Sequence, residues 1–435
     1  MINKLKKIKI PKVSKTAKSP KQILRHQKDQ YVVGLDIGTE YIKALIAKVD
    51  GSNAEIIGMG RVHQQLGDMQ AGAIADISAV VANCDRALSQ AEQQAGLSAR
   101  TAVIGIAGEL VKGTTTTVRY RRNDPKRELT IEEVGKIVSK VQQRAEQKAR
   151  KRLAWELGGK QVDIRLVNSA LVSIEIDGYK VTNPIGFQGR DVVVQLYTAF
   201  APLVHIGALE RTAQQLDLDL LAVAAEPFAV ARSVIGENTG SNMSAILMDI
   251  GGGTTDVAVI NDGGVQGTKM FGIGGRAFTR SIERELAIDF EQAEELKTNL
   301  NHNNLTEQKN QEMREALKKT LVVWLHGVEL ALSEFDNLDH LPQRVLLCGG
   351  GSSLKMIASN LSQTKWYKDL PFTKQPIIQL INPDQVEGIT DATGQVNDHT
   401  FITALGLVRV GVDTLQQDDN KQDSIKARID RMLKV

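Results

Sequence analysis

Residues 245–260 read AILMDIGGGTTDVAVI, and this stretch decides the fold. An apolar run leads into a turn that starts at Asp249, and a second apolar run follows. The pattern predicts two buried strands joined by a glycine-rich hairpin. Backbone N–H groups in such a turn can approach a bound anion closely, and threonine hydroxyls add donors. The residues expected to contact phosphate are Gly251, Gly252, Gly253, Thr254 and Thr255.

The same layout occurs near the start of the chain, where residues 31–49 read YVVGLDIGTEYIKALIAKV. Taken alone, this segment is equally compatible with a simple hairpin. Its recurrence predicts two related lobes that hold a polyphosphate between them, with Gly38 and Thr39 on the first side. Asp36 and Asp249 would then hold a Mg²⁺ ion through its water molecules, because Mg²⁺ keeps part of its hydration shell.

A third glycine run follows an apolar segment at residues 344–354, which read RVLLCGGGSSL. The pattern predicts a buried strand, a turn and the start of a helix. Without side chains on the turn, a flat base can lie against the backbone. The residues expected to line the base are Gly349, Gly350, Gly351 and Ser352.

The two DIG hairpins and the GGGSS run resemble the actin-like ATPase superfamily over roughly residues 30–415, and in particular the bacterial cell-division protein FtsA family. The narrower match is carried by residues 57–60 (IGMG), 67–77, 177–189 (DGYKVTNPIGFQG), 272–275 (GIGG) and 293–297 (AEELK). The resemblance implies a two-lobed α/β fold of duplicated ribonuclease-H-like domains. It also implies an inserted α+β (SHS2-like) subdomain and a C-terminal amphipathic helix.

The same resemblance implies a division of the chain into segments. These are a basic arm (1–29), a first lobe (30–100), the insert (101–190), a return to the first lobe (191–225), a second lobe (226–398) with a reduced upper subdomain (about 276–325), a closing helix (399–415), a linker (416–423) and the amphipathic segment (424–435). Only 51 residues separate Lys297 from Gly349, and their pattern is mostly helical. FtsA proteins have more chain here, so the pilus-assembly protein PilM, which shares the fold, is the alternative relative.

Site residues follow from the resemblance, position by position. Glu226 would orient the attacking water, assisted by Asp249 and Thr255. Glu294 and Lys297 would contact the adenosine, and Gly274 and Gly275 belong to a further nucleotide motif. From the residues alone, Glu226 is equally an acid favoured by a helix start, and Glu294 with Lys297 a solvated pair. The expected cofactors are ATP and Mg²⁺, and whether ATP is hydrolysed stays open.

The two ends of the chain are basic. Residues 1–28 hold ten basic residues and no acidic one, which fits a solvated disordered arm, a membrane-surface arm or, less well without aromatic residues, a nucleic-acid contact. Residues 424–435 carry an apolar stripe of Ile425, Ile429, Met432 and Leu433, with Lys426, Arg428 and Arg431 off the stripe. This spacing predicts an amphipathic helix on an anionic membrane surface, or a last helix docked on its own domain.

Composition bounds the function. The chain has 435 residues, 54 basic and 51 acidic, and no apolar run long enough to cross a bilayer. The two cysteines and seven histidines show no metal-ligand spacing. The resemblance to the FtsA family, rather than the composition, implies an ATP-binding protein that assembles into filaments on the cytoplasmic face of the inner membrane, tethers the tubulin-like FtsZ ring at the division site and recruits later division proteins. The alternatives are a PilM-like adaptor, a small-molecule kinase and a chaperone-type ATPase. A kinase would need an acid that acts as base toward the acceptor hydroxyl, and none is identified. A chaperone would need a substrate-binding domain after the two lobes. No nucleic-acid partner is expected.

Overall fold

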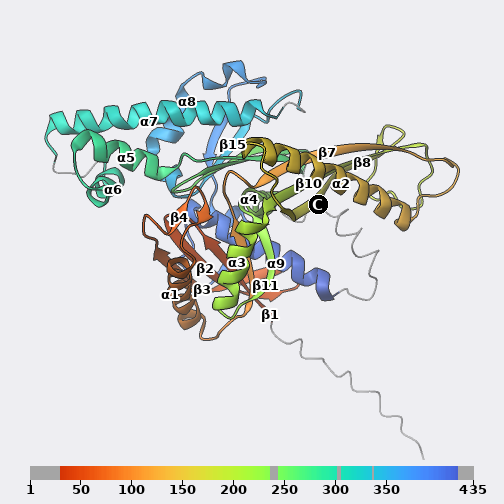
Figure 1. The fold of residues 1–435 in the computed structure, drawn as a ribbon, viewed down its shortest axis with the longest axis horizontal. Coiled ribbons are helices and arrows are strands. Elements are labelled where there is room, and N and C mark those ends of the chain that lie inside the picture. The colour runs from red at the N-terminus through yellow and green to blue at the C-terminus, as the bar shows by residue number, and fades with distance from the viewer. Residues whose placement is uncertain (1–29, 236–242, 301–304, 336–337, 420–435) are drawn as a thin grey trace, which may run out of the picture.

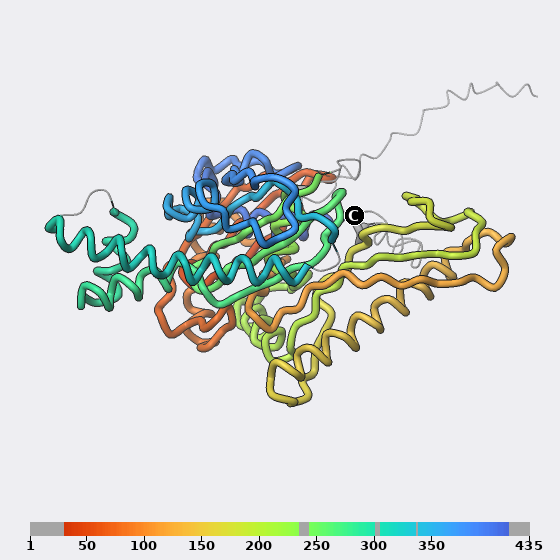
Figure 2. Tube along the Cα trace, turned by 90° about the horizontal axis from the view of Figure 1, so that it is seen from above, coloured from red at the N-terminus to blue at the C-terminus, as the bar shows by residue number. Residues whose placement is uncertain are grey.

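The computed structural model describes residues 30–235, 243–300, 305–335 and 338–419. The predicted basic arm, the amphipathic segment and residues 420–423 of the predicted linker lie outside these ranges. Two lobes lie against each other, and two arms extend to opposite sides of the molecule (Figures 1 and 2). One arm holds the helices α5 (Gly275–Leu286), α6 (Phe290–Thr298) and α7 (Glu307–Ser333), and the other holds α2 (Ile131–Glu156) with strands of the second sheet.

The first lobe is built on a sheet whose strand order, in the described residues, is β11-β6-β1-β2-β3-β17. Its strands are β1 (Gln30–Ile37), β2 (Tyr41–Asp50), β3 (Asn53–His63), β6 (Thr101–Ile106), β11 (Asp219–Ala225) and β17 (Ile389–Asp391). Helices α1 (Ile77–Ala95), α3 (Leu203–Gln215) and α9 (Ile402–Asp419) cover it, and β4 (Met69–Gln70) pairs with β5 (Ala73–Ile74). Because both faces are covered, β1 and β2 read as nearly continuous apolar runs.

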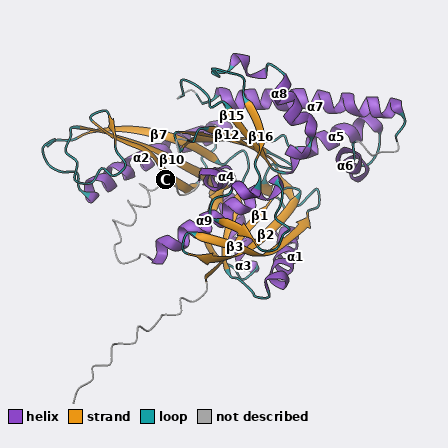
Figure 3. Cartoon of the chain, turned by 180° about the vertical axis from the view of Figure 1, so that it is seen from behind, coloured by secondary structure: helices purple, strands orange, loops and turns teal. Residues whose placement is uncertain are grey.

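A second sheet has, in the described residues, the order β16-β15-β12-β13-β14-β7-β10-β8-β9. The second lobe supplies β12 (Ala245–Ile250), β13 (Thr255–Asn261), β14 (Gly264–Phe271), β15 (Arg344–Cys348) and β16 (Ile377–Leu380). The insert supplies β7 (Lys112–Arg121), β8 (Ile164–Ile176), β9 (Tyr179–Lys180) and β10 (Asp191–Pro202), with α2 (Ile131–Glu156) packed on β7 and β10. The insert thus interrupts the first lobe in sequence, yet its sheet continues that of the second lobe (Figure 3).

The joint between the two parts of this sheet is the pairing of β14 with β7, at Gly267 with Thr114 and Thr268 with Gly113. A Cβ atom at Gly113 would lie 1.9 Å from the Thr268 hydroxyl oxygen, so only glycine allows this approach. The pairing also corrects the predicted borders of the insert. Strand β6, which starts at Thr101, belongs to the first-lobe sheet, and β10 lies inside the insert sheet rather than in the first lobe. An apolar strand pattern does not reveal which sheet the strand joins.

The remaining helices surround the cleft: α4 (Glu226–Ile235), α5 (Gly275–Leu286), α6 (Phe290–Thr298), α7 (Glu307–Ser333) and α8 (Lys355–Gln363). Short 3₁₀ turns span Gly350–Ser353, Trp366–Asp369, Pro383–Gln385 and His399–Phe401. Among the described residues between α6 and β15, the long helix α7 is the only regular element, with Met313, Leu317 and Trp324 buried on one face. The predicted upper subdomain is therefore helical where it is described.

The last described helix is longer than predicted. Helix α9 continues to Asp419, so the first four residues of the predicted linker are helical. These residues are polar, but glutamine is a good helix former, and polarity alone does not end a helix. No helix among the described residues is long and apolar enough to span a membrane.

Candidate functional site

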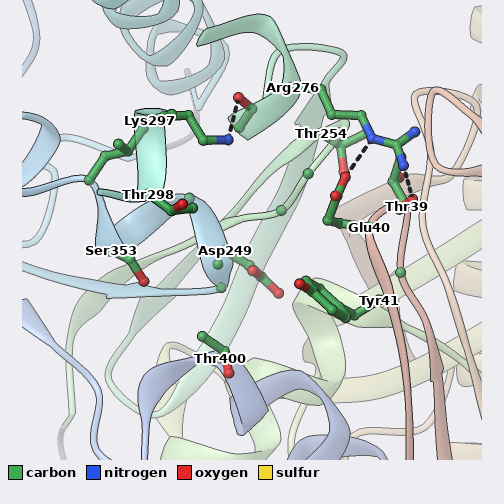
Figure 4. A pocket seen from close by; sticks show the side chains of 18 of the residues that line it. Thr39, Glu40, Tyr41, Asp249, Thr254, Arg276, Lys297, Thr298, Ser353 and Thr400 are labelled. Atoms are coloured by element: carbon green, nitrogen blue, oxygen red, sulfur yellow. Dashed lines mark hydrogen bonds and ion pairs between the residues drawn. The ribbon is translucent and has the colours of Figure 1, made fainter. Parts of the chain in front are cut away.

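A cavity of about 900 Å³ lies between the lobes and is lined by both predicted hairpin turns, the third glycine run and helices α5 to α8 (Figure 4). The structure brings most of the predicted residues to this one place. Those that line it are Asp36, Gly38, Thr39, Glu226, Asp249, Gly251, Gly252, Thr254, Gly275, Glu294, Lys297, Gly349, Gly350 and Gly351.

Four predicted residues do not line the cavity. Gly253 and Gly274 are packing positions: a Cβ atom would lie 2.9 Å from the Thr39 hydroxyl oxygen at Gly253, and 2.6 Å from the Gly251 carbonyl oxygen at Gly274. Ser352 is buried and donates its hydroxyl to the Cys348 carbonyl at 2.5 Å. These residues hold the turns in place without facing the cavity.

Thr255 is the fourth, and its expected catalytic assistance does not fit its placement. Its hydroxyl donates to the Ile273 carbonyl at 2.7 Å and accepts from the Trp324 ring N–H at 2.9 Å, on the side away from the cavity. Successive side chains of extended backbone point to opposite faces, so Thr254, just before β13, and Asp256 face the cavity instead. Sequence reasoning missed Asp256, although this alternation signals it.

Carboxyl groups crowd the inner end of the cavity. Asp36, Glu226, Asp249 and Asp256 are all buried, and Lys43 Nζ contacts Asp36 Oδ2 at 2.8 Å. Asp249 accepts a hydrogen bond from the Thr403 hydroxyl, whereas Asp256 Oδ1 has no hydrogen-bond partner among the described residues. An unpaired buried carboxylate oxygen is costly, and it marks a place where a ligand group or ion can bind.

Burial and mutual repulsion shift the titration of this cluster. Burial, followed by the charges of Asp36, Asp256 and Asp249, raises the pKa of Glu226 well above its ordinary value. Burial and then Asp249 do the same to the pKa of Asp256. Burial alone would lower the pKa of Lys43, but the ion pair with Asp36 and the field of Asp249 outweigh it and raise that pKa. The cluster therefore contains more carboxyl groups than Lys43, the neighbouring cation, can neutralise.

The carboxyl groups and glycine turns of the cavity fit a hydrated cation that is bound together with a phosphate group. Among the described residues, no three His, Cys, Asp or Glu side chains converge closely enough to hold a metal ion by themselves. Mg²⁺ at phosphate sites typically keeps several waters and takes one or two carboxylates together with phosphate oxygens. The orphaned Asp256 oxygen and the facing glycine turns meet that requirement.

The outer end of the cavity has a different chemistry. Lys297 Nζ donates to Glu294 Oε2 at 2.6 Å, to the Thr279 hydroxyl at 2.9 Å and to the Gly275 carbonyl at 3.2 Å, so its three protons are all engaged. Gly349, at φ +81°, lies so close to Asp249 that a Cβ atom would be 2.0 Å from the carboxylate oxygen. The third glycine run and the carboxyl cluster therefore form one continuous wall.

Sequence reasoning also missed residues whose partners lie far along the chain. Arg276 contacts Glu40 and Thr39 across the cleft (Figure 4). The Arg61 guanidinium lies 3.9 Å from the ring centre of Tyr41, and both line the cavity. Further lining residues are Arg314, Lys318, Ser353, Lys355, Thr400 and Thr403. No local sequence motif indicates that these residues line the cavity.

Comparisons with known proteins agree with the predicted family. A family model described as "Cell division protein FtsA" matches residues 246–406. Cell division protein FtsA of Bacillus subtilis is 24% identical over 277 residues, which cover 63% of this chain and 59% of that protein. Cell division protein FtsA of Pseudomonas aeruginosa is 24% identical over 422 residues, which cover 92% and 93%. The chain thus spans about three fifths of the first relative and nearly all of the second.

A solved structure titled "PilM-PilN type IV pilus biogenesis complex" has a TM-score of 0.62 at 18% identity, and the match covers 88% of this chain and 98% of that chain. At this identity the likeness shows the fold alone. The predicted actin-like α/β fold and the resemblance to the FtsA family are confirmed.

Proposed function

We propose that this chain, which is similar to FtsA proteins and has the actin-like fold, is a cell-division protein whose interlobe cleft binds ATP with Mg²⁺. The observation that carries the nucleotide proposal is the opposition of two glycine hairpins across a cavity that contains four buried carboxyl groups. Backbone N–H groups of these turns supply donors for phosphate oxygens. The third glycine run and the Glu294–Lys297 pair provide the walls for the adenosine.

The residues divide by their place in the cleft. Asp36, Asp249 and Asp256 would hold the hydrated Mg²⁺. The ion would neutralise part of the negative charge that the phosphates and these carboxylates bring together. Glu226 lies on the same wall and can hold a water molecule or take its proton. Its raised pKa means that the free protein keeps this carboxyl protonated over a wider pH range than an exposed glutamate. We infer slow hydrolysis at most, with ATP acting mainly on lobe closure.

The proposed role in cell division rests on the similarity to FtsA proteins. We propose that the protein assembles into filaments at the cytoplasmic surface of the inner membrane, with the amphipathic segment 424–435 as the anchor. The FtsZ-like ring and later division proteins are the proposed partners. The basic arm, residues 1–29, provides a second region that anionic lipids can attract. Both regions lie outside the described residues, so the support for them is the sequence pattern.

A pilus-assembly role like that of PilM is the second candidate. The observation that favours it is the segment between α6 and β15, where α7 is the only regular element among the described residues. The likeness to the PilM structure over 98% of that chain is compatible with this candidate. Recovery of proteins crosslinked to the chain in cells separates the two: division-ring components support the first role, and pilus inner-membrane components the second.

The nucleotide proposal is tested by calorimetric titration of the full chain with ATP, with and without Mg²⁺. We expect binding that needs Mg²⁺ and that Asp256→Asn weakens. Asp262→Asn is the matched control, since Asp262 lies in the turn between β13 and β14 and is 58% exposed. Binding that is equal in both variants, or absent from the unaltered chain, would refute the proposed site.

A further inference from the structure

Arg276 joins the two phosphate hairpins from one position. It lies in the first turn of α5, and its backbone N–H donates to the Gly252 carbonyl of the second hairpin at 2.8 Å. Its guanidinium donates to Glu40 Oε2 at 2.6 Å and to the Thr39 carbonyl at 2.7 Å, both in the first hairpin (Figure 4). One residue therefore bridges the lobes at the phosphate end of the cavity.

The bridge is enclosed and braced. The side chains of Arg276 and Glu40 are 11% and 17% exposed, and His63 Nε2 lies 2.7 Å from the other oxygen of Glu40. The hairpins touch beneath the bridge, since a Cβ atom at Gly252 would lie 2.9 Å from Glu40 Cβ. Removal of one partner from an enclosed charge pair is costly because it leaves the other charge buried, whereas loss of a surface pair costs little.

We propose that Arg276 is a positioning residue that clamps the two phosphate hairpins together and thereby sets how long a polyphosphate stays in the cleft. This inference rests on the proposed nucleotide function. A polyphosphate held between the hairpins leaves when they separate, and separation breaks both guanidinium contacts. The clamp acts through Glu40, so removal of either side chain has the same consequence.

The clamp differs from a direct phosphate contact in its predicted response to Glu40→Gln. As a clamp, the bridge weakens whichever partner is changed. As a direct ligand, Arg276 released from Glu40 would be freer to meet phosphate, so Glu40→Gln would slow release or leave it unchanged. The two single variants therefore separate the mechanisms, and the double variant measures whether the residues act as one unit.

The first experiment measures the dissociation rate of fluorescent ATP from the full chain by stopped flow. We expect Glu40→Gln and Arg276→Gln each to accelerate release by about tenfold or more, as for other enclosed charge pairs, and the double variant to be no faster than the faster single variant. Arg280→Gln is the matched control, because Arg280 lies one turn later on α5 and is 59% exposed. Unchanged or slower release in Glu40→Gln, or fully additive effects, would overturn the clamp.

A second measurement does not need nucleotide. Spin labels on cysteines introduced at the exposed positions Gln93 of α1 and His326 of α7 report the distance between the lobes. Cys84 and Cys348 are buried and do not compete for label. The clamp predicts a wider or broader distance distribution in both single variants without ligand, and an unchanged distribution overturns it. If the unaltered chain binds no nucleotide, the proposed function fails while this measurement still decides the clamp.

Discussion

Replacing Glu226 by glutamine is expected to stabilise the ligand-free protein, and more so as the pH rises. Glu226 is 7% exposed and faces Asp36, Asp249 and Asp256, so both burial and repulsion disfavour its ionised form. An acid whose pKa is raised in the folded state keeps its proton where the unfolded chain has lost it. Its contribution to stability therefore falls as the pH rises from about 4.5 through the folded pKa.

The size of the effect follows from the shift. Each unit by which folding raises the pKa costs about 1.4 kcal/mol of stability once the pH exceeds the folded value. Glutamine has nearly the same shape and carries no charge, so it removes this cost without adding atoms. Denaturant unfolding at about pH 5 and about pH 8 should give a free-energy difference between variant and parent that grows with pH.

The control is Glu210→Gln, because Glu210 forms an exposed pair with Arg165 and its loss should change stability by less than about 1 kcal/mol at either pH. If Glu226→Gln gives the same difference from the parent at both pH values, or destabilises the protein more at the higher pH, then the carboxyl is not held protonated by its surroundings. The assignment of Glu226 to a crowded acidic site would then be wrong.

Three further predictions address the same cleft and the proposed membrane anchor. Asp249→Ala should weaken ATP binding at least tenfold, about 1.4 kcal/mol, if its metal contact is lost, and an unchanged affinity by titration would contradict this role. Gly105→Ala places a Cβ atom 2.8 Å from Glu226 Oε1 and should lower ATP turnover with little change in affinity; equal losses of both would point to a general distortion instead. Deletion of residues 424–435 should release the protein from anionic vesicles, and undiminished co-sedimentation would assign the anchoring to another part of the chain.

The sequence predicted the hairpins of the cleft because each is a local pattern. Apolar alternation and runs define the strands, and glycines define the turns, so residues 31–49 and 245–260 carry their structure with them. Asp256 lay within reach of the same reasoning, since Asp256 and Thr254 lie on either side of Thr255 and alternate with it in direction. We predicted a catalytic role for the Thr255 hydroxyl instead, but this group contacts Trp324 on the side away from the cavity.

Other features could not be predicted because their partners are distant in the chain. Arg276 and Glu40 are 236 positions apart, and neither has a sequence context that indicates the other. The pairing of β14 with β7 is of the same kind, since a strand pattern specifies a strand and leaves its neighbour open. Tertiary packing decides such contacts, so a single sequence gives the elements with more certainty than their arrangement.

The joined sheet links the cleft to the insert. Strand β13 is the second strand of the second glycine-rich hairpin and pairs with β14, and β14 pairs with β7 of the insert. Glu334, which follows α7, contacts both Lys269 of β14 and Arg152 of α2, and this cluster braces the joint. The insert strands also pack against the first lobe, because Ala170 of β8 and Tyr197 of β10 belong to the apolar core that includes β1 and β2. The Asn168 side chain of β8 accepts a hydrogen bond from the Ala225 N–H at 2.8 Å, so the insert contacts both lobes and touches the residue next to Glu226.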